Sequence, residues 1–268
     1  AATISGGQGG SALKQYSTIS GGYNNKANGF SDFVGGGWQN TVTGQFSAIS
    51  GGYGNSVSGY YAVVGGGTSN EGSGTASSVG GGMNNIAKSD VSTVSGGSNN
   101  IAQSTGATVA GGGHNSASGF YSAALSGYHN TVTGSYALVG GGSWNSALGD
   151  YSVVGGGGAD INDEHHRNHA RNDWSVIVGG RGNTCAGDVA FIGGGESLTV
   201  SSAFAVVVGG QYQRIGSNAS HAFIGGGTKN AADAAYSAVL GGKGNTAGAL
   251  FSVVAGGKDN SVKDSFSS

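Results

Sequence analysis

The stretch VTGQFSAISGGYGNSVSGYYAVVGGGTSN, residues 42–70, reads almost the same twice over. Ile49 and Asn55 in its first half return fifteen residues later as Val64 and Asn70. A fixed short period is the sequence signature of a repeat architecture. We therefore align the chain on the Val or Ile that occupies the place of Ile49, which we call the anchor, and count other positions from it.

The repeat covers nearly the whole chain of 268 residues, in about 17 units. Steps between anchors are fifteen residues, except for eight extra residues before Ile177 and two extra before Ile224. Position +3 is Gly in every unit, position +2 is Gly except at Ser126, and position +6 is Asn in about 13 of 17 units. The anchors are Ile4, Ile19, Val34, Ile49, Val64, Val79, Val94, Val109, Ala124, Val139, Val154, Ile177, Ile192, Val207, Ile224, Val239 and Val254.

These columns predict an all-β fold, a parallel β-roll or β-solenoid of about 17 fifteen-residue coils. A unit of this length is too short for two helices, and residues near the anchor are β-branched or aromatic, which favours strands. Glycine supplies the positive φ of sharp turns, and a repeated Asn can hydrogen-bond along the stack. The absence of proline agrees, since proline removes a donor from the ladder. We expect one solenoid domain over 1–268 with an insertion loop at about 158–173.

The predicted anchor strand is apolar on both faces. The position two before the anchor is small and shares the inner face with it. On the other face we place the positions one and three before the anchor; the latter is aromatic in more than half of the units, as at Tyr136 and Tyr151. A long exposed apolar stripe is unusual for a soluble monomer. We therefore expect a symmetric homo-oligomer, with the alternative that the aromatic rings only cover the coil edge.

Composition excludes several classes of protein. Lys and Arg number 11 against 13 Asp and Glu, without the basic stripe of a nucleic-acid binder. No apolar run approaches the length of a transmembrane helix, so we expect no membrane insertion in this segment. The single Cys185 cannot form an internal disulfide. The chain begins at Ala1 without Met, as a processed or trimmed product would.

The pattern A-x-[VI]-x-G-x-x-N-x-A-x-G, as in SAISGGYGNSVSG, resembles the head repeats of trimeric autotransporter adhesins. Similar repeats occur in phage tail fibres. The resemblance implies a left-handed β-roll, a homotrimer, an extracellular place on a cell surface or virion, and attachment to a host or cell-surface glycan or protein. The Gly-Gly pair and the strong Asn column depart from the usual repeat, and no anchor barrel or coiled-coil stalk follows.

Aromatic side chains near the Gly-Gly turn are candidate ligand contacts, because the fold constrains the turn tips least. Exposed aromatic ladders stack on sugar rings, and they equally form plain cross-strand pairs. The candidates are Tyr23, Trp38, Tyr53, Trp144 and Tyr212. An equally weighted alternative is that the segment is only a spacer.

The predicted insertion concentrates charge and histidine. His165, His166 and His169 are a candidate metal site, because imidazole is a common ligand of transition metals. A solvated projecting loop is the favoured interpretation of the same residues. His114 and His129 occupy one column of adjacent units, which predicts a stacked pair of neutral imidazoles or, as the rarer alternative, a metal pair.

No nucleophile elbow, phosphate-binding loop or zinc motif is present, so we expect neither an enzyme nor a cofactor. The function predicted is a structural or adhesive fibre segment. The alternatives are a spacer and a polysaccharide-degrading tailspike-type enzyme, for which Asp160, Asp163 and Glu164 are the only acidic cluster. Ice binding requires a regular Thr array, whereas Thr before the anchor is confined to Thr3, Thr18, Thr93 and Thr108.

Overall fold

The computed structural model describes residues 1–158 and 166–263. Its regular elements are strands of two residues each, arranged as coils with two strands per coil. The chain divides into two compact units, Ala1–His129 (unit 1) and Asn130–Ser268 (unit 2). The predicted parallel β-solenoid of about 17 fifteen-residue coils is confirmed.

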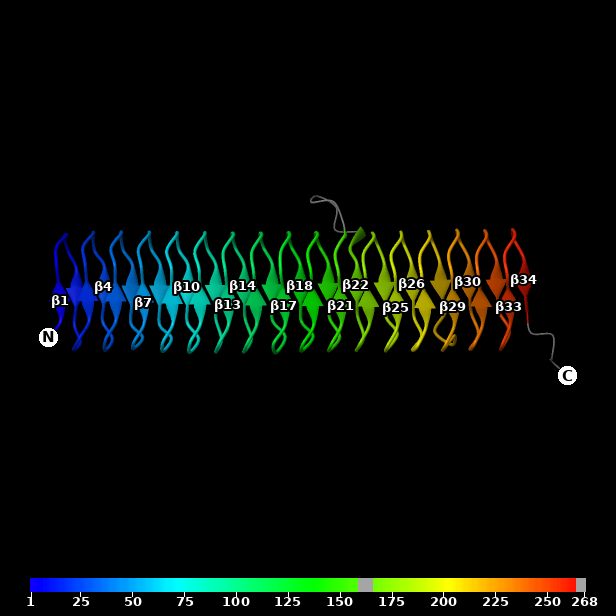
Figure 1. Cartoon of the computed structure of the whole chain (residues 1–268), viewed down its shortest axis with the longest axis horizontal. Helices are drawn as coiled ribbons and strands as arrows, with labels where there is room; N and C mark the ends of the chain where they lie inside the picture. Colours follow the sequence, from blue (N-terminus) through cyan, green and yellow to red (C-terminus); the bar gives the residue numbers. More distant parts are fainter. Residues whose placement is uncertain (159–165, 264–268) are drawn as a thin grey trace. The chain divides into compact units, whose positions relative to one another are not determined.

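In unit 1 the odd-numbered strands contain the anchors and the even-numbered strands contain position +8 (Figure 1). The anchor strands are β1 (Thr3–Ile4), β3 (Thr18–Ile19), β5 (Phe33–Val34), β7 (Ala48–Ile49), β9 (Val63–Val64), β11 (Ser78–Val79), β13 (Thr93–Val94), β15 (Thr108–Val109) and β17 (Ala123–Ala124). The second strands are β2 (Ser11–Ala12), β4 (Lys26–Ala27), β6 (Thr41–Val42), β8 (Ser56–Val57), β10 (Glu71–Gly72), β12 (Ile86–Ala87), β14 (Ile101–Ala102) and β16 (Ser116–Ala117).

Unit 2 repeats this arrangement. Its anchor strands are β19 (Leu138–Val139), β21 (Val153–Val154), β23 (Val176–Ile177), β25 (Phe191–Ile192), β27 (Val206–Val207), β29 (Phe223–Ile224), β31 (Ala238–Val239) and β33 (Val253–Val254). Its second strands are β18 (Thr131–Val132), β20 (Ser146–Ala147), β22 (His169–Ala170), β24 (Thr184–Cys185), β26 (Thr199–Val200), β28 (Arg214–Ile215), β30 (Ala231–Ala232), β32 (Thr246–Ala247) and β34 (Ser261–Val262).

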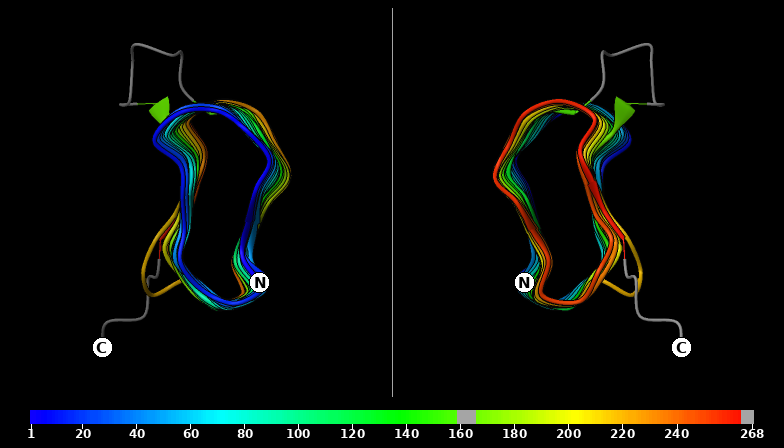
Figure 2. Two further views of the ribbon diagram at one scale, coloured as in Figure 1. Left: turned by 90° about the vertical axis from the view of Figure 1, so that its left-hand side faces the viewer. Right: turned by 90° about the vertical axis from the view of Figure 1, so that its right-hand side faces the viewer.

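Each strand pairs in parallel with the equivalent strand of the next coil. In unit 1, for example, Ile49 lies beside Val64 and Val42 beside Val57. Seen end on, the coils of each unit superpose on a flattened loop whose two long sides are the two sheets (Figure 2). Two turns join the sheets: one at the Gly-Gly pair, which we call the Gly-Gly edge, and one that precedes each anchor strand.

The interior of the coil is filled by three small or branched columns. Anchors such as Ile49, position +8 residues such as Val57, and position −2 residues such as Ser47 and Ala62 are all buried. The prediction that position −2 shares the inner face with the anchor is confirmed. Asp32 is the acidic exception in this column, and its carboxylate accepts hydrogen bonds from the amides of Gly29 at 2.7 Å and Ser47 at 3.3 Å.

Position −3 does not belong to the strand, so that part of the sequence prediction is wrong. Non-glycine residues there have positive φ, for example 56° at Phe46 and 58° at Tyr151. The cause lies in the hydrogen bonds. Strand amides donate to the following coil, as from Ala48 to Ala62, whereas the Phe46 amide donates to Phe30 in the preceding coil. The left-handed residue reverses the direction of the amide.

The same reversal occurs at position +5, at the Gly-Gly edge. Gln39 has φ 57° and its amide donates backwards to the carbonyl of Tyr23 at 2.9 Å. Glycine at position +3 has a separate requirement. At Gly52, with φ 95°, an added Cβ would lie 2.2 Å from the Gly67 carbonyl oxygen, while at Gly51 it would meet nothing within 4 Å. This difference explains why position +3 is invariant and position +2 admits Ser126.

The Asn column at position +6 forms the inner side of the Gly-Gly edge. The side-chain amide of Asn55 donates to the carbonyls of Gly51 and Gly67, each at 3.0 Å, and its Oδ1 accepts from the amide of Asn70 at 2.9 Å. The predicted ladder therefore runs mainly between side chain and backbone. A direct side-chain bond also joins Asn55 to Asn40 at 3.1 Å.

Candidate functional site

Three aromatic side chains lie in consecutive coils on the outer side of the Gly-Gly edge of unit 1. Tyr23, Trp38 and Tyr53, the aromatic trio, occupy position +4 and are joined by parallel β-bridges. Ring centroids are 5.2 Å apart for Tyr23 and Trp38 and 6.1 Å apart for Trp38 and Tyr53. Both pairs meet edge to face, and Trp38 is 52% exposed. The trio is therefore brought together on the surface as predicted from the sequence.

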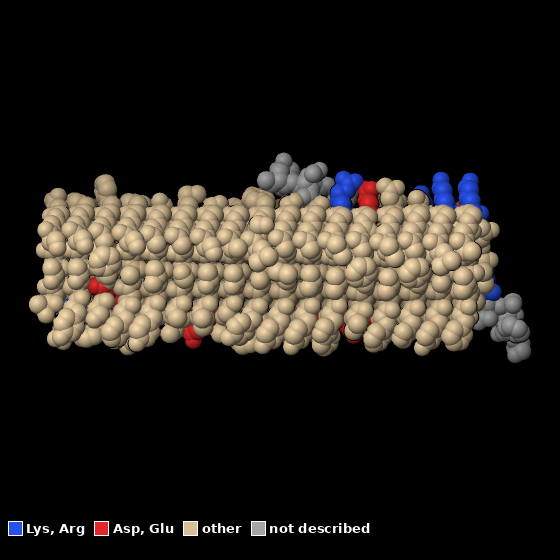
Figure 3. Space-filling model, viewed as in Figure 1, with Lys and Arg blue, Asp and Glu red and all other residues tan. Residues whose placement is uncertain are grey.

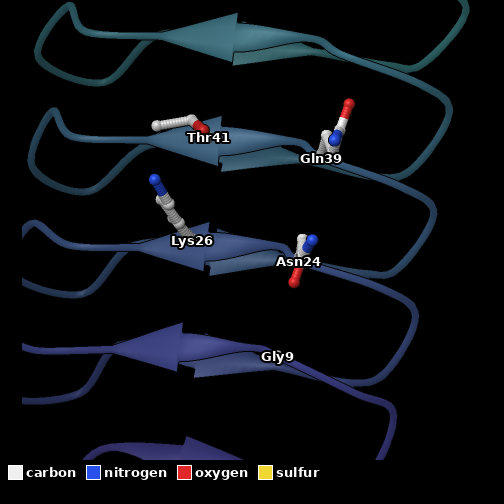
Figure 4. A pocket seen from close by; sticks show the side chains of 5 residues that line it. All are labelled: Gly9, Asn24, Lys26, Gln39 and Thr41. Carbon is white, nitrogen blue, oxygen red and sulfur yellow. The ribbon is translucent and has the colours of Figure 1, made fainter.

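A shallow polar depression of about 440 Å³ adjoins the trio on the face of the second-strand sheet. We call it the polar groove; it is lined by Gly9, Asn24, Lys26, Gln39 and Thr41. Figure 4 shows the side chains of positions +5 and +7 standing at its corners on two adjacent coils. Asn24 and Gln39 directly follow Tyr23 and Trp38 in the chain, so the trio and the groove belong to the same turns of the coil.

The polar side chains of the groove have no partners among the described residues. Within residues 1–158 and 166–263, the side chains of Asn24, Lys26, Gln39 and Thr41 make no hydrogen bond or ion pair. Farther along the same +5 column, the Asn84 amide donates to Asn99 at 3.2 Å. The groove thus presents two amides, an ammonium group and a hydroxyl to solvent, whereas Asn84 and Asn99 of the same +5 column bond to each other.

Sequence reasoning identified the trio and, as neighbouring turn-tip residues, Asn24 and Gln39, but missed the groove that these two form with Lys26 and Thr41. Lys26, Gln39 and Thr41 carry no motif, and single polar residues on a strand are ordinary. The alignment of the repeats could have indicated the groove, because it places Lys26 and Thr41 at +7 and Asn24 and Gln39 at +5 in neighbouring units.

Trp144 and Tyr212 belong to a different position from the trio. Both stand at +5 in unit 2, with φ 59° and 56°, and not at +4. The guanidinium carbon of Arg167 lies 5.9 Å from the Trp144 ring centroid, within the range of a cation–π contact. These two residues therefore form separate surface features.

The three predicted metal ligands have different outcomes. His165 lies outside the described residues. His166 and His169 are described, and among the described residues no three His, Cys, Asp or Glu side chains group as a metal site would require. Burial, followed by the positive charges of Arg171 and Arg167, lowers the pKa of His169 to about 4. The positive charges of Arg171 and Arg167 would repel a cation at His169.

The coil resumes soon after the extra residues. Asn168 takes the place of the Asn column, donating to the carbonyls of Gly156 at 3.1 Å and Gly180 at 2.8 Å. Its neighbour His169 begins β22, so the end of the predicted insertion, at 168–173, is part of the regular coil. Asp160, Asp163 and Glu164 lie outside the described residues.

His114 and His129 form the predicted stacked pair in unit 1. Their ring centroids are 4.7 Å apart and their planes differ by 14°. Burial and then the charge of His114 lower the pKa of His129, which favours the neutral form of the His129 imidazole. Tyr128 packs edge-on against both rings, so the stack also serves as a surface cluster.

Position +4 carries charge in unit 2. Arg181 pairs with Glu196, which also accepts from Gln211 at 3.0 Å, and Lys243 lies beside Lys258. Figure 3 shows this gathering of cationic side chains along the Gly-Gly edge of unit 2. The same turn therefore carries aromatic rings in one unit and ionised groups in the other.

The fold defines the class of protein as a parallel β-solenoid with repetitive edges. The chain matches no protein-family model, and a search of curated proteins finds no related sequence. In the described residues no helix has the length and apolar character that crossing a membrane would take.

Proposed function

We propose that the chain is a structural and adhesive segment of an extracellular fibre. It attaches to a glycan-bearing surface through the aromatic trio and the polar groove of unit 1. The resemblance to trimeric adhesin heads and phage tail fibres agrees with this role. The observation that carries the proposal is the pairing of exposed aromatic rings with unpartnered polar groups, because sugar rings offer an apolar face together with hydroxyl groups.

The backbone of the Gly-Gly edge is suited to display variable contacts. Asn40 fixes the turn from inside through the carbonyls of Gly36 and Gly52, each at 2.9 Å. The outward Trp38 and Gln39 contribute no side-chain bond to this network. Their identities can therefore change without disturbing the turn, which is the property that a repetitive binding surface needs.

Assembly as a homotrimer is the second part of the proposal. Exposed apolar side chains line the anchor-strand sheet of unit 2, among them Val178, Val208 and Leu240, and the −3 aromatics flank them. Association would bury this surface, which water otherwise disfavours.

Light scattering tests the assembly. A trimer of 25.9 kDa chains is expected, and a stable monomer would refute it. Replacing Tyr136 and Tyr151 by Lys should dissociate it, because two charges would enter the interface. Thr199→Lys, on the opposite sheet of unit 2, is the matched control and should leave the trimer intact.

Attachment is tested with two variants of the whole chain on a glycan array. One replaces Tyr23, Trp38 and Tyr53 with Ser; the other deletes residues 159–166, which restores the fifteen-residue period. Loss of glycan binding in the Ser variant alone supports the proposal. If both variants stay folded and bind as the parent does, the trio is not the attachment site, and if the parent binds no glycan, the segment is a spacer. Release of shortened glycan products would instead favour the enzyme alternative.

A further inference from the structure

The polar groove carries an inference about the chemical class of the ligand, and it rests on the proposed function. We propose that the groove binds an extended, anionic polysaccharide whose chain runs along the coil stack, with Lys26 pairing with a carboxylate or sulfate group of the sugar.

The charge of the groove selects the sign of the ligand. Lys26 is exposed and is the one ionised group among the five lining residues. Asp32, the nearest carboxyl along the chain, is buried inside the coil and bonded to backbone amides. No carboxylate is among the lining residues, and the next acidic side chain of the +7 column, Glu71, stands three coils from Lys26. A ligand in the groove therefore meets a positive charge there, and a charge-assisted hydrogen bond is stronger than a neutral one.

The spacing of the groove selects an extended chain. Equivalent residues of adjacent coils repeat at about 4.8 Å, a rise close to that of one sugar in an extended pyranose chain. Asn24 and Gln39 stand one coil apart at +5, and Lys26 and Thr41 one coil apart at +7 (Figure 4). Two successive sugars lying along the stack would therefore each meet one amide and one group of the +7 column.

The aromatic trio, at the same turns as the groove, supplies the apolar contact. Tyr23 and Trp38 meet edge to face, whereas rings elsewhere on unit 1, such as Phe46 and Tyr61, stack with planes 13° apart. Edge-to-face rings do not cover each other's faces fully. The C–H face of a sugar can then lie on Trp38 while its polar groups point into the groove.

Gly9 is part of the binding surface. An added Cβ at Gly9 would lie 2.1 Å from Oδ1 of Asn24, so the Asn24 side chain occupies the space that a side chain at position 9 would fill. The absence of a side chain thus sets where the Asn24 amide presents its donors.

The experiment measures the binding of three hexasaccharides to the whole chain by calorimetry: an oligogalacturonate, a sulfated chondroitin fragment and neutral cellohexaose. Binding of at least one anionic oligomer about tenfold tighter than cellohexaose is expected, with the difference shrinking as salt rises. The two anionic arms separate carboxylate from sulfate recognition. Lys26→Met should remove the preference, lowering anionic affinity about tenfold, while Lys88→Met on the same unit should not.

Each result decides between the two proposals. If Lys26→Met binds the anionic oligomer as the parent does, or if the parent prefers cellohexaose, the anionic class is wrong, yet loss of binding in the Ser variant of the trio would still uphold glycan attachment. If the parent binds none of the three oligomers, this inference is overturned. If the trio variant binds as the parent does, the proposed aromatic site fails.

Discussion

Asn100 tests how much one member of the Asn column stabilises the coil. Its amide nitrogen donates to the carbonyls of Gly96 and Gly112, both at 2.9 Å, and its Oδ1 accepts from the amide of Asn115 at 3.0 Å. The Gly112 carbonyl keeps a second donor, from Ser98 at 3.0 Å. Asn100→Ala therefore leaves the Asn115 amide and the Gly96 carbonyl without these partners and removes one further bond.

The expected cost follows from these three losses. The Asn115 amide lies in a buried bond, so leaving it unsatisfied costs about 1–3 kcal/mol, while the two part-buried bonds to Gly96 and Gly112 cost about 1 kcal/mol each, so Asn100→Ala should lower the free energy of unfolding by roughly 3–5 kcal/mol. The matched control is Asn260, whose exposed side chain donates, within the described part of the chain, only to Gly256, at 2.9 Å. Asn260→Ala should cost about 1 kcal/mol.

Urea unfolding followed by circular dichroism measures both values, and hydrogen exchange of the Asn115 amide reports the local effect. Exchange at Asn115 should accelerate in the Asn100→Ala variant. Equal costs at Asn100 and Asn260, or unchanged exchange at Asn115, would refute the reasoning. Asn100→Leu should cost less than the Ala variant because a buried Leu recovers apolar burial; Leu198, fully buried in the same column, is the natural example.

Three other results are expected. Gly97→Ala should destabilise strongly, because its Cβ would lie 2.1 Å from the Gly112 oxygen, whereas Gly96→Ala, with nothing within 4 Å, should change stability by less than about 1 kcal/mol in urea unfolding. The pKa of His169 is lowered to about 4 in the fold, so the unfolded chain binds more protons than the folded chain between that pH and about 6.5. The free energy of unfolding should therefore fall as pH drops through this window. His169→Gln should weaken this dependence of the unfolding free energy on pH. Burial raises the pKa of Asp32, so its charged form disfavours folding; Asp32→Ser should stabilise the chain at neutral pH, with the gain vanishing as pH falls below about 3.8, the unfolded value.

The period in the sequence was sufficient to predict the coil, its two strands and its core. The core columns can be recognised in the sequence because a narrow interior accepts only small or branched side chains, as Ser47 and Ile49 illustrate. The Asn column was also predicted from the sequence, but its preference for hydrogen bonds to backbone groups over bonds between side chains was not. That choice depends on the path of the Gly-Gly turn, which composition does not specify.

The conformation of position −3 was the main failure. Aromatic residues favour strands in general, so Tyr136 and Tyr151 were placed on a strand face. Gly106 stands in the same column with φ 66°, and a glycine among aromatics was the sequence signal for a left-handed turn. The groove could not be predicted because a binding surface of single polar residues requires the pairing of neighbouring coils in three dimensions.

The aromatic character of position −3 has a physical reason that the strand interpretation hid. A non-glycine residue in the left-handed region costs roughly 1–2 kcal/mol. In unit 2 the rings of Tyr136, Tyr151 and Trp174 stack at centroid distances of 5.2 and 5.3 Å, with planes 8° and 4° apart. Each aromatic pair contributes about 0.5–1.5 kcal/mol beyond burial, which offsets much of the backbone cost.

Stacking also explains which side chains can share the column. Phe204, His221 and Tyr236 form a second stack at centroid distances of 5.0 and 4.8 Å, so a histidine ring fits between a Phe and a Tyr. Val189 has φ 54° and no ring to stack, so it bears the strain without this compensation. Recurrent aromatics at this turn thus stabilise a strained coil one pair at a time, and the same rings present the apolar ridge that the proposed assembly would bury.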